Sequence, residues 1–376
     1  MSNRIYSSHI HTIVIGGGQA GLSVGYHLRK LGIPFLILDA HRRIGDAWRN
    51  RWDSLRLFTP ARYCGLPGLP FPGRGDSFPT KDDVAHYLEL YAKYFQLPLE
   101  TNAKVNLLSR NGNRFVVTAG DQRFESENVV VAMANYQVPK RPAFATEINT
   151  SIVQLHAHEY RNPAQLPEGD VLIVGAGNSA ADIAIEVART HETWMSGKES
   201  GFVPLPIDGI LGRQFLSRVI RFIGHHVLTL STPIGRKKRP VLLRRTTPLI
   251  RVKPKDLIAA GITRVPKVAG VRYGLPWLED GRTLNIKSIV WCTGYTPGFS
   301  WIDLPVLGSD GLPAHELGGV RNAPGLFFVG LHYLYSMTSA TLVGVGRDAQ
   351  RIAQAIASRQ AAPVGAAVGP KSVQAA

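Results

Sequence analysis

The stretch TIVIGGGQAG, residues 12–21, decides the fold of this chain. Four residues typical of a buried strand lead into a run of glycines with the pattern Gly16-x-Gly18-x-x-Gly21. In such a pattern the first glycine permits a tight turn, the second lets a pyrophosphate approach the backbone, and the third lets helix and strand pack closely. The phosphates then lie at a helix N-terminus, where free N–H groups favour negative charge. The stretch therefore predicts a dinucleotide site.

The residues that follow complete this unit. Apolar side chains recur at helical spacing, Gly32 is placed to end the helix, and FLIL at 35–38 predicts a second strand. Asp39 ends that strand about 20 positions after the glycines, where an acidic residue binds a ribose without a 2′-phosphate, as in FAD or NAD. The predicted contacts are Gly16, Gly18, Gln19, Ala20, Gly21 and Asp39.

A second fingerprint, GAGNSA at 175–180, follows the apolar run VLIV at 171–174. The next predicted strand, TWM at 193–195, leads into Ser196-Gly197-Lys198, which has no carboxylate at the strand end and a cation close by. This pattern favours a 2′-phosphate, hence NADPH over NAD, with a solvated surface lysine as the alternative reading of Lys198. The predicted contacts are Gly175, Gly177, Asn178, Ser179, Ala180, Ser196 and Lys198.

The composition fits a two-domain protein of 376 residues with no transmembrane helix, because no apolar run of the required length occurs. The first strand follows the N-terminus too closely for a signal peptide, so we expect the cytoplasm. Cys64 and Cys292 are far apart and form no C-x-x-C motif, which argues against a disulfide reductase.

The net charge of +16 suggests a nucleic-acid partner, but the sequence does not support one. The densest basic stretch, residues 236–255, lacks interleaved aromatic residues and any nucleic-acid motif, and it suits a face near an anionic cofactor. Residues 211–230 predict a basic amphipathic helix that packs on its domain or covers a pocket, with peripheral membrane contact as the alternative.

No metal site is expected, because none of the paired histidines stands with carboxylates or cysteines at ligand spacing. These pairs are His9 and His11, His156 and His158, and His225 and His226.

The motifs suggest a division of the chain into four parts. We expect a FAD-binding domain over 8–144, a NAD(P)H-binding domain over 145–290, a return to the FAD-binding domain over 291–360, and a disordered tail over 361–376. Further elements are expected as helices over 82–95 and 340–357, and as strands over 115–118, 124–133 and 326–329.

Three shorter motifs accompany the two fingerprints. They are GDAW at 45–48, FPTK at 78–81 with the helix after it, and CTGY at 292–295. Together these motifs resemble the flavin-containing monooxygenases, specifically the short bacterial members, over about residues 10–358. The resemblance implies an α/β protein with two Rossmann-like, doubly wound domains, the NADPH domain being inserted in the FAD domain.

The resemblance also implies an activity. NADPH reduces FAD, reduced flavin takes up O₂ as a C4a-(hydro)peroxide, and a soft nitrogen or sulfur nucleophile of a small substrate attacks the outer oxygen. Trp48, together with backbone N–H groups of Ser339 and Ala340, joins the FAD site, and Phe58 and Thr59 are candidates beside the flavin. Two alternatives remain: a flavin reductase for another acceptor without oxygenation, and a redox-sensing accessory flavoprotein of an ion transporter. The oligomeric state is open, with a homodimer as one candidate.

The chain departs from the family pattern at several points. Of the signature F-x-G-x-x-x-H-x-x-x-Y/F, only the second half is present, as His156 and Tyr160, and Tyr160 in place of a Trp favours heteroatom oxygenation over Baeyer–Villiger chemistry. His156 is either a linker histidine or part of the cofactor cleft. The interdomain strand ends in Ala132-Met133-Ala134 in place of Ala-Thr-Gly, and Gly330-Leu331-His332 replaces a Gly-Asp pair.

Overall fold

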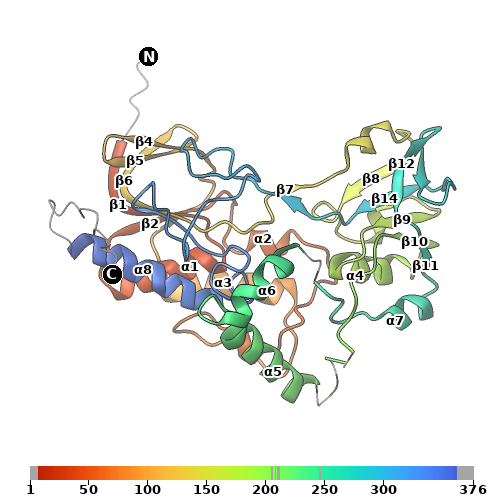
Figure 1. The fold of residues 1–376 in the computed structure, drawn as a ribbon, viewed down its shortest axis with the longest axis horizontal. Helices are drawn as coiled ribbons and strands as arrows, with labels where there is room; N and C mark the ends of the chain where they lie inside the picture. The colour runs from red at the N-terminus through yellow and green to blue at the C-terminus, as the bar shows by residue number, and fades with distance from the viewer. Residues whose placement is uncertain (1–6, 205, 208, 210–211, 245–246, 362–376) are drawn as a thin grey trace, which may run out of the picture.

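The computed structural model describes residues 7–204, 206–207, 209, 212–244 and 247–361, which form two lobes, each built on its own sheet (Figure 1). The sheet of the first lobe has parallel strands in the order β3-β2-β1-β6, and β16 pairs with β6. Their bounds are β1 Ser7–Ile15, β2 Phe35–Leu38, β3 Leu99–Glu100, β6 Gln122–Val131 and β16 Leu326–Phe328.

Strand β6 changes its neighbour halfway along. Its first half pairs with the antiparallel hairpin of β4 (Val105–Asn111) and β5 (Arg114–Ala119), and its second half pairs with β16. The strands at the centre of the sheet are buried on both faces, which explains why the sequence shows continuous apolar runs there.

Three helices cover one face of this sheet, and their apolar sides form one core with Val14, Ile37 and Val130. They are α1 (Gln19–Lys30), α3 (Lys81–Tyr94) and α8 (Val345–Ala361). The other face packs against the β4–β5 hairpin and residues 299–323 and 331–334. Short elements complete the lobe: α2 (Asp46–Arg49) and the 3₁₀ turn η1 (Ala61–Tyr63).

The second lobe has a fully parallel sheet in the order β11-β10-β9-β14-β8. Its strands are β8 (Val153–His156), β9 (Val171–Val174), β10 (Thr193–Ser196), β11 (Thr263–Val265) and β14 (Ser288–Trp291). The remaining elements of the lobe are α4 (Asn178–Val187), α7 (Pro254–Ala259), the hairpin β12 (Val268–Arg272) and β13 (Leu275–Leu278), and the 3₁₀ turns η2 (Ala143–Glu147) and η3 (Pro163–Gln165).

Two short antiparallel strands join the lobes: β7 (Val138–Pro139) and β15 (Tyr295–Thr296) (Figure 1). The whole second sheet therefore lies between β6 and β16 of the first sheet in the sequence. This arrangement confirms the predicted α/β class with two Rossmann-like domains, one inserted in the other.

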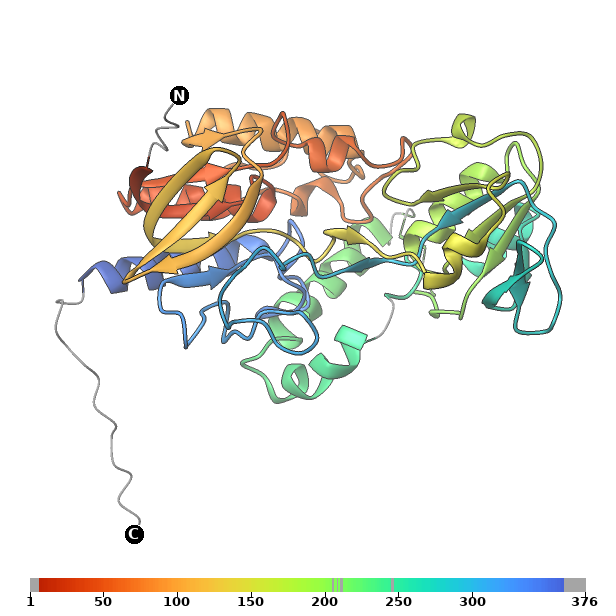
Figure 2. The same cartoon turned by 90° about the horizontal axis from the view of Figure 1, so that it is seen from above.

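The chain between β10 and β11 leaves the second sheet and packs on the first lobe (Figures 1 and 2). It contains the π-helical turns η4 (Gly212–Leu216) and η5 (Ile223–Val227), α5 (Ser217–Phe222) and α6 (Pro233–Arg244). The Leu230 amide donates to the Tyr335 carbonyl at 2.8 Å, and the Tyr333 hydroxyl donates to the Gly235 carbonyl at 3.1 Å. The amphipathic helix predicted over 211–230 is thus present over 212–227 with π-helical ends, and residue 211 lies outside the described residues.

Most predicted element bounds are confirmed to within one or two residues, but the last helix was predicted too early at both its start and its end, since it ends at Ala361 and not at residue 357. It begins at Val345, not at Ala340. The Thr341 amide and hydroxyl both donate to the Thr338 carbonyl, at 2.9 and 2.7 Å, so local hydrogen bonds hold a turn where the helix was expected. Ala361, where the tail was expected to begin, still belongs to α8, and residues 362–376 lie outside the described part.

Candidate functional site

The three glycines of the first fingerprint have three different structural roles. Gly16 has a φ of +109°, which favours glycine. A Cβ on Gly21 would lie 1.9 Å from the Gly16 carbonyl oxygen, so only glycine allows this close packing. Gly18, in contrast, has extended backbone, and a Cβ placed there would meet nothing within 4 Å. Gly18 therefore faces open space at the N-terminus of α1, as a pyrophosphate cradle requires.

Asp39 lies beside this cradle and is 8% exposed. One carboxylate oxygen accepts the Gly17 amide at 2.6 Å, and the other accepts the His41 amide at 2.8 Å. Burial opposes ionisation of Asp39, but hydrogen bonds from His41 and Gly17 outweigh it and lower the pKa. A carboxylate has about four acceptor positions, so Asp39 retains capacity for ribose hydroxyls, and its environment fits the predicted role.

Residues far apart in the sequence meet at the same helix end. The Gln19 side chain donates to the Ala340 carbonyl, and the Trp48 indole donates to the Gln19 side chain, both at 3.4 Å. Gly330 lies against Ala20, where a Cβ on Gly330 would be 2.9 Å from the Ala20 side chain. The structure thus brings together the predicted FAD residues of the first fingerprint, the GDAW motif and the segment before α8.

The remaining candidates on this side are less clearly placed. The Ser339 side chain is fully buried within its turn, and its amide donates to the Ser336 carbonyl at 3.1 Å, so both groups already have partners within the protein. Phe58 is 45% exposed in the loop before η1, next to Thr59. The assignments of Ser339, Phe58 and Thr59 to the flavin stay predictions.

The second fingerprint repeats the geometry of the first. Gly175 has a φ of +134°, and a Cβ there would lie 2.4 Å from the Cys292 carbonyl oxygen. Gly177 has extended backbone at the N-terminus of α4, followed by Ser179 and the buried Ala180. The Asn178 amide group donates to the Pro248 carbonyl at 3.0 Å, and its oxygen accepts the Ile250 amide at 2.8 Å. Asn178 therefore holds residues 248–250 over the N-terminus of α4.

The end of β10 carries the residues predicted to read a 2′-phosphate. Ser196 is fully buried, and its hydroxyl donates to the Pro266 carbonyl at 2.9 Å and accepts the Val268 amide at 3.1 Å. Its only proton is thus committed within the protein. Lys198 is exposed two residues further on.

The sequence analysis missed a second cation at this place. Arg264, on β11, lies opposite Met195 in the register and donates to the Gly197 carbonyl at 2.7 Å. It is half-buried, and burial lowers its pKa. Arg264 could have been found from its position on the third strand of this Rossmann unit, because that strand, β11, pairs with the second strand, β10.

Two residues of the family signature are present, His156 and Tyr160, and both make structural hydrogen bonds within the protein. The ring of His156 is fully buried, accepts the His158 amide at 3.1 Å and donates to the Gly294 carbonyl at 3.0 Å. Burial lowers its pKa, so the neutral ring fastens the linker beside β15. The Tyr160 hydroxyl, also buried, donates to the Glu186 carboxylate at 3.3 Å.

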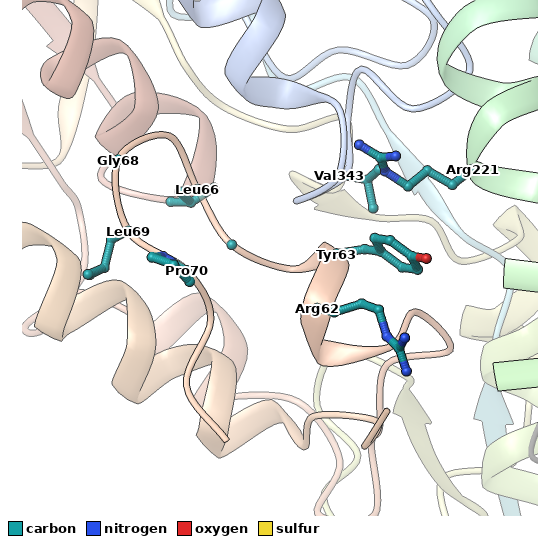
Figure 3. A pocket seen from close by; sticks show the side chains of 9 residues that line it. Arg62, Tyr63, Leu66, Gly68, Leu69, Pro70, Arg221 and Val343 are labelled. Atoms are coloured by element: carbon teal, nitrogen blue, oxygen red, sulfur yellow. The ribbon is translucent and has the colours of Figure 1, made fainter. Parts of the chain in front are cut away.

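A pocket with a volume of about 460 Å³ lies between residues 62–70 and helix α5 (Figure 3). The Arg62 and Arg221 guanidinium groups lie 6.0 and 5.2 Å from the centroid of the Tyr63 ring, and Leu66, Leu69 and Val343 complete much of the lining. Two guanidinium groups therefore lie near one aromatic ring in the lining of this pocket.

Both cysteines are free, and burial raises the pKa of each thiol to about 12. Neither is therefore a thiolate that could exchange with a disulfide. Within the described residues no three His, Cys, Asp or Glu side chains are arranged to hold a metal ion, and no helix there is long and apolar enough to cross a membrane.

Two nucleotide-type βαβ units in two lobes, joined through β7 and β15, define a flavoprotein oxidoreductase with two dinucleotide sites. The family model for pyridine nucleotide-disulphide oxidoreductases matches residues 13–200, half of the chain. An uncharacterized CzcO-like oxidoreductase of Geobacillus kaustophilus is 37% identical over 91% of this chain and 96% of its own.

A solved structure points to the same group. The flavin-containing monooxygenase of Stenotrophomonas maltophilia is 28% identical with a TM-score of 0.76, over 94% of this chain and 99% of its own. A probable indole-3-pyruvate monooxygenase of Arabidopsis thaliana, YUCCA3, is 27% identical over 92% of this chain and 86% of its own. The chain belongs to the flavin-containing monooxygenase family of pyridine-nucleotide oxidoreductases, whose cofactors are FAD and NADPH.

Proposed function

We propose that this oxidoreductase is a monooxygenase that inserts one oxygen atom of O₂ into a nitrogen or sulfur atom of a small substrate in the cytoplasm. NADPH supplies two electrons, and the second oxygen atom leaves as water. The relatives at 27–28% identity that are named monooxygenases support this proposal. The observation that carries it is the meeting of Gln19, Trp48 and Ala340 at the cradle of the first fingerprint, which supports a flavin site there, and neither cysteine offers a thiolate for disulfide chemistry.

The residues of this chain bind and orient, and the bound flavin supplies the O₂ chemistry. Gly18 and Asp39 hold the dinucleotide part of FAD in the first lobe. Gly177 and the α4 N-terminus hold NADPH in the second lobe, and the linker fastened by His156 sets how the two lobes meet. The Arg62–Arg221 pocket would take an anionic part of the substrate.

The proposal is tested with labelled oxygen. The FAD-loaded enzyme is given NADPH, ¹⁸O₂ and a panel of amines, sulfides and ketones, and products and hydrogen peroxide are both measured. We expect one ¹⁸O atom per product molecule for an amine or a sulfide, with NADPH consumed in equal amount. Oxidation of NADPH that yields only peroxide, or passes electrons only to an added acceptor, would instead favour a reductase, in agreement with relatives described only as oxidoreductases.

Cofactor choice gives a second prediction. The Lys198→Ala variant should require about five- to thirtyfold more NADPH for half-maximal flavin reduction, because a partly exposed pair with a 2′-phosphate contributes on the order of 1–2 kcal/mol. Arg264→Gln should act in the same direction, since its guanidinium lies at Gly197 beside Lys198. Reduction by NADH should change little in either variant.

The matched control is Lys93→Ala, at an exposed lysine at the end of α3 in the other lobe. It should leave reduction by both nucleotides at the wild-type level. Equal losses for NADH and NADPH in Lys198→Ala and Arg264→Gln would show that neither residue reads the phosphate.

A further inference from the structure

Residues 212–244, here called the basic hairpin, form a surface that nucleotide binding does not explain. Eight of these 33 residues are Lys or Arg and none is Asp or Glu. The helices of the hairpin stand out from the body of the first lobe (Figures 1 and 2). The basic hairpin thus carries a net charge of +8, half of the net charge of +16 of the whole chain.

The same surface exposes large apolar side chains. Phe215 is 69% exposed, Phe222 59% and Ile234 57%. Further exposed apolar residues of the hairpin are Ile220, Ile223, Val241, Leu242 and Leu243. A cluster of this kind on one element marks a contact site rather than an ordinary surface.

The apolar and basic side chains share the outward faces of the helices. Phe215 in η4 and Phe222 at the end of α5 are seven residues apart, and both side chains are more than half exposed. On α6, Ile234 and Val241 have the same spacing, and Lys237 and Lys238 lie between them on the same face. Lysine stems can lie along an apolar layer while their charges reach its polar boundary.

The inner side of the hairpin is already covered. Gly224 is buried, and the His225 ring makes a hydrogen bond to the Thr338 hydroxyl at 3.1 Å. The Met337 amide donates to the Leu228 carbonyl at 3.0 Å. The hairpin is thus held against the first lobe by its inner side, and the exposed apolar residues are directed away from that contact.

We propose that the basic hairpin docks this enzyme on an anionic lipid bilayer, with Phe215, Phe222 and Ile234 entering the interfacial layer. The charge of the basic hairpin favours a bilayer over a second copy of the chain as its binding partner. A second copy of the chain would bring like charges together, among them the exposed Arg218, Lys237 and Lys238, whereas anionic headgroups neutralise them. A nucleic acid would match the charge but would leave the aliphatic residues of α6 uncovered. Mixed apolar and basic faces are typical of helices that lie in a membrane interface.

The test uses the full-length, FAD-loaded protein and flotation with vesicles. Vesicles of phosphatidylcholine mixed with phosphatidylglycerol should carry the protein upward, and added salt should weaken the binding. Pure phosphatidylcholine vesicles should bind it at least tenfold less. Lys237→Gln with Lys238→Gln, and separately Phe215→Ser with Phe222→Ser, should each reduce binding about tenfold or more.

Matched controls carry the same changes elsewhere. Ile258→Ser, at a 74% exposed residue of α7, and Lys93→Gln should bind anionic vesicles as the wild type does. NADPH oxidation without vesicles should be unchanged in all variants, which shows that they fold. Equal binding to neutral vesicles, or no loss in the hairpin variants, would overturn the proposal. So would hairpin-dependent binding to an oligonucleotide in the absence of vesicle binding, or a dimer that the Phe215→Ser and Phe222→Ser changes dissociate.

Discussion

The Gly18→Val protein should fold and bind its yellow cofactor more weakly than the wild type. Gly18 has a φ of −78° and a ψ of −171°, which a β-branched residue also adopts, and a Cβ there would meet nothing within 4 Å. The valine methyl groups would instead occupy the space that the pyrophosphate needs. Overpacking of about 1–3 kcal/mol corresponds to FAD binding that is about five- to 150-fold weaker. The measurement is FAD titration by fluorescence, with circular dichroism to monitor the fold.

The comparison variant is Gly21→Val, in the same turn. A Cβ at Gly21 would lie 1.9 Å from the Gly16 carbonyl oxygen, so this protein should lose stability as well as FAD. A comparison of the two variants thus distinguishes loss of space for the pyrophosphate from loss of the close packing between α1 and the first strand. If Gly18→Val retained one FAD per chain with wild-type affinity, the first fingerprint would not be the flavin site.

The turns of both nucleotide sites could be predicted from the sequence because their requirements are local. A positive φ at Gly16 and Gly175 and close packing at Gly21 restrict these positions to glycine whatever the rest of the fold does. The buried central strands were predicted for the same reason, since burial on both faces leaves continuous apolar runs.

Residues that depend on the meeting of distant segments were harder to predict. The resemblance, not the local pattern, suggested Trp48 and Ala340, which reach the first fingerprint through Gln19. Arg264 was missed because only the pairing of β11 with β10 places it beside Gly197. Ser196 was expected to read a phosphate, but its hydroxyl donates to the Pro266 carbonyl instead, a partner 70 residues away. Long-range hydrogen bonds of this kind leave no periodic signal in the sequence.

The Gly177→Val variant should keep one FAD per chain and require about five- to 150-fold more NADPH to reduce it. Gly177 has a φ of −85° and a ψ of −175°, so valine fits the backbone, and the change lies in the second lobe, apart from the flavin site of the first. Gly175 would not serve, because a side chain there would collide with the Cys292 carbonyl at 2.4 Å and disturb the fold.

Stopped-flow reduction of the bound flavin, as a function of NADPH concentration, measures the effect. Reduction by dithionite does not use the second lobe and should proceed as in the wild type, which makes it the internal control. Loss of FAD with unchanged dependence on NADPH would reverse the assignment of the two lobes. Because Gly18→Val and Gly177→Val make the same change at equivalent positions of the two fingerprints, opposite effects on the two cofactors would assign each site independently of any relative.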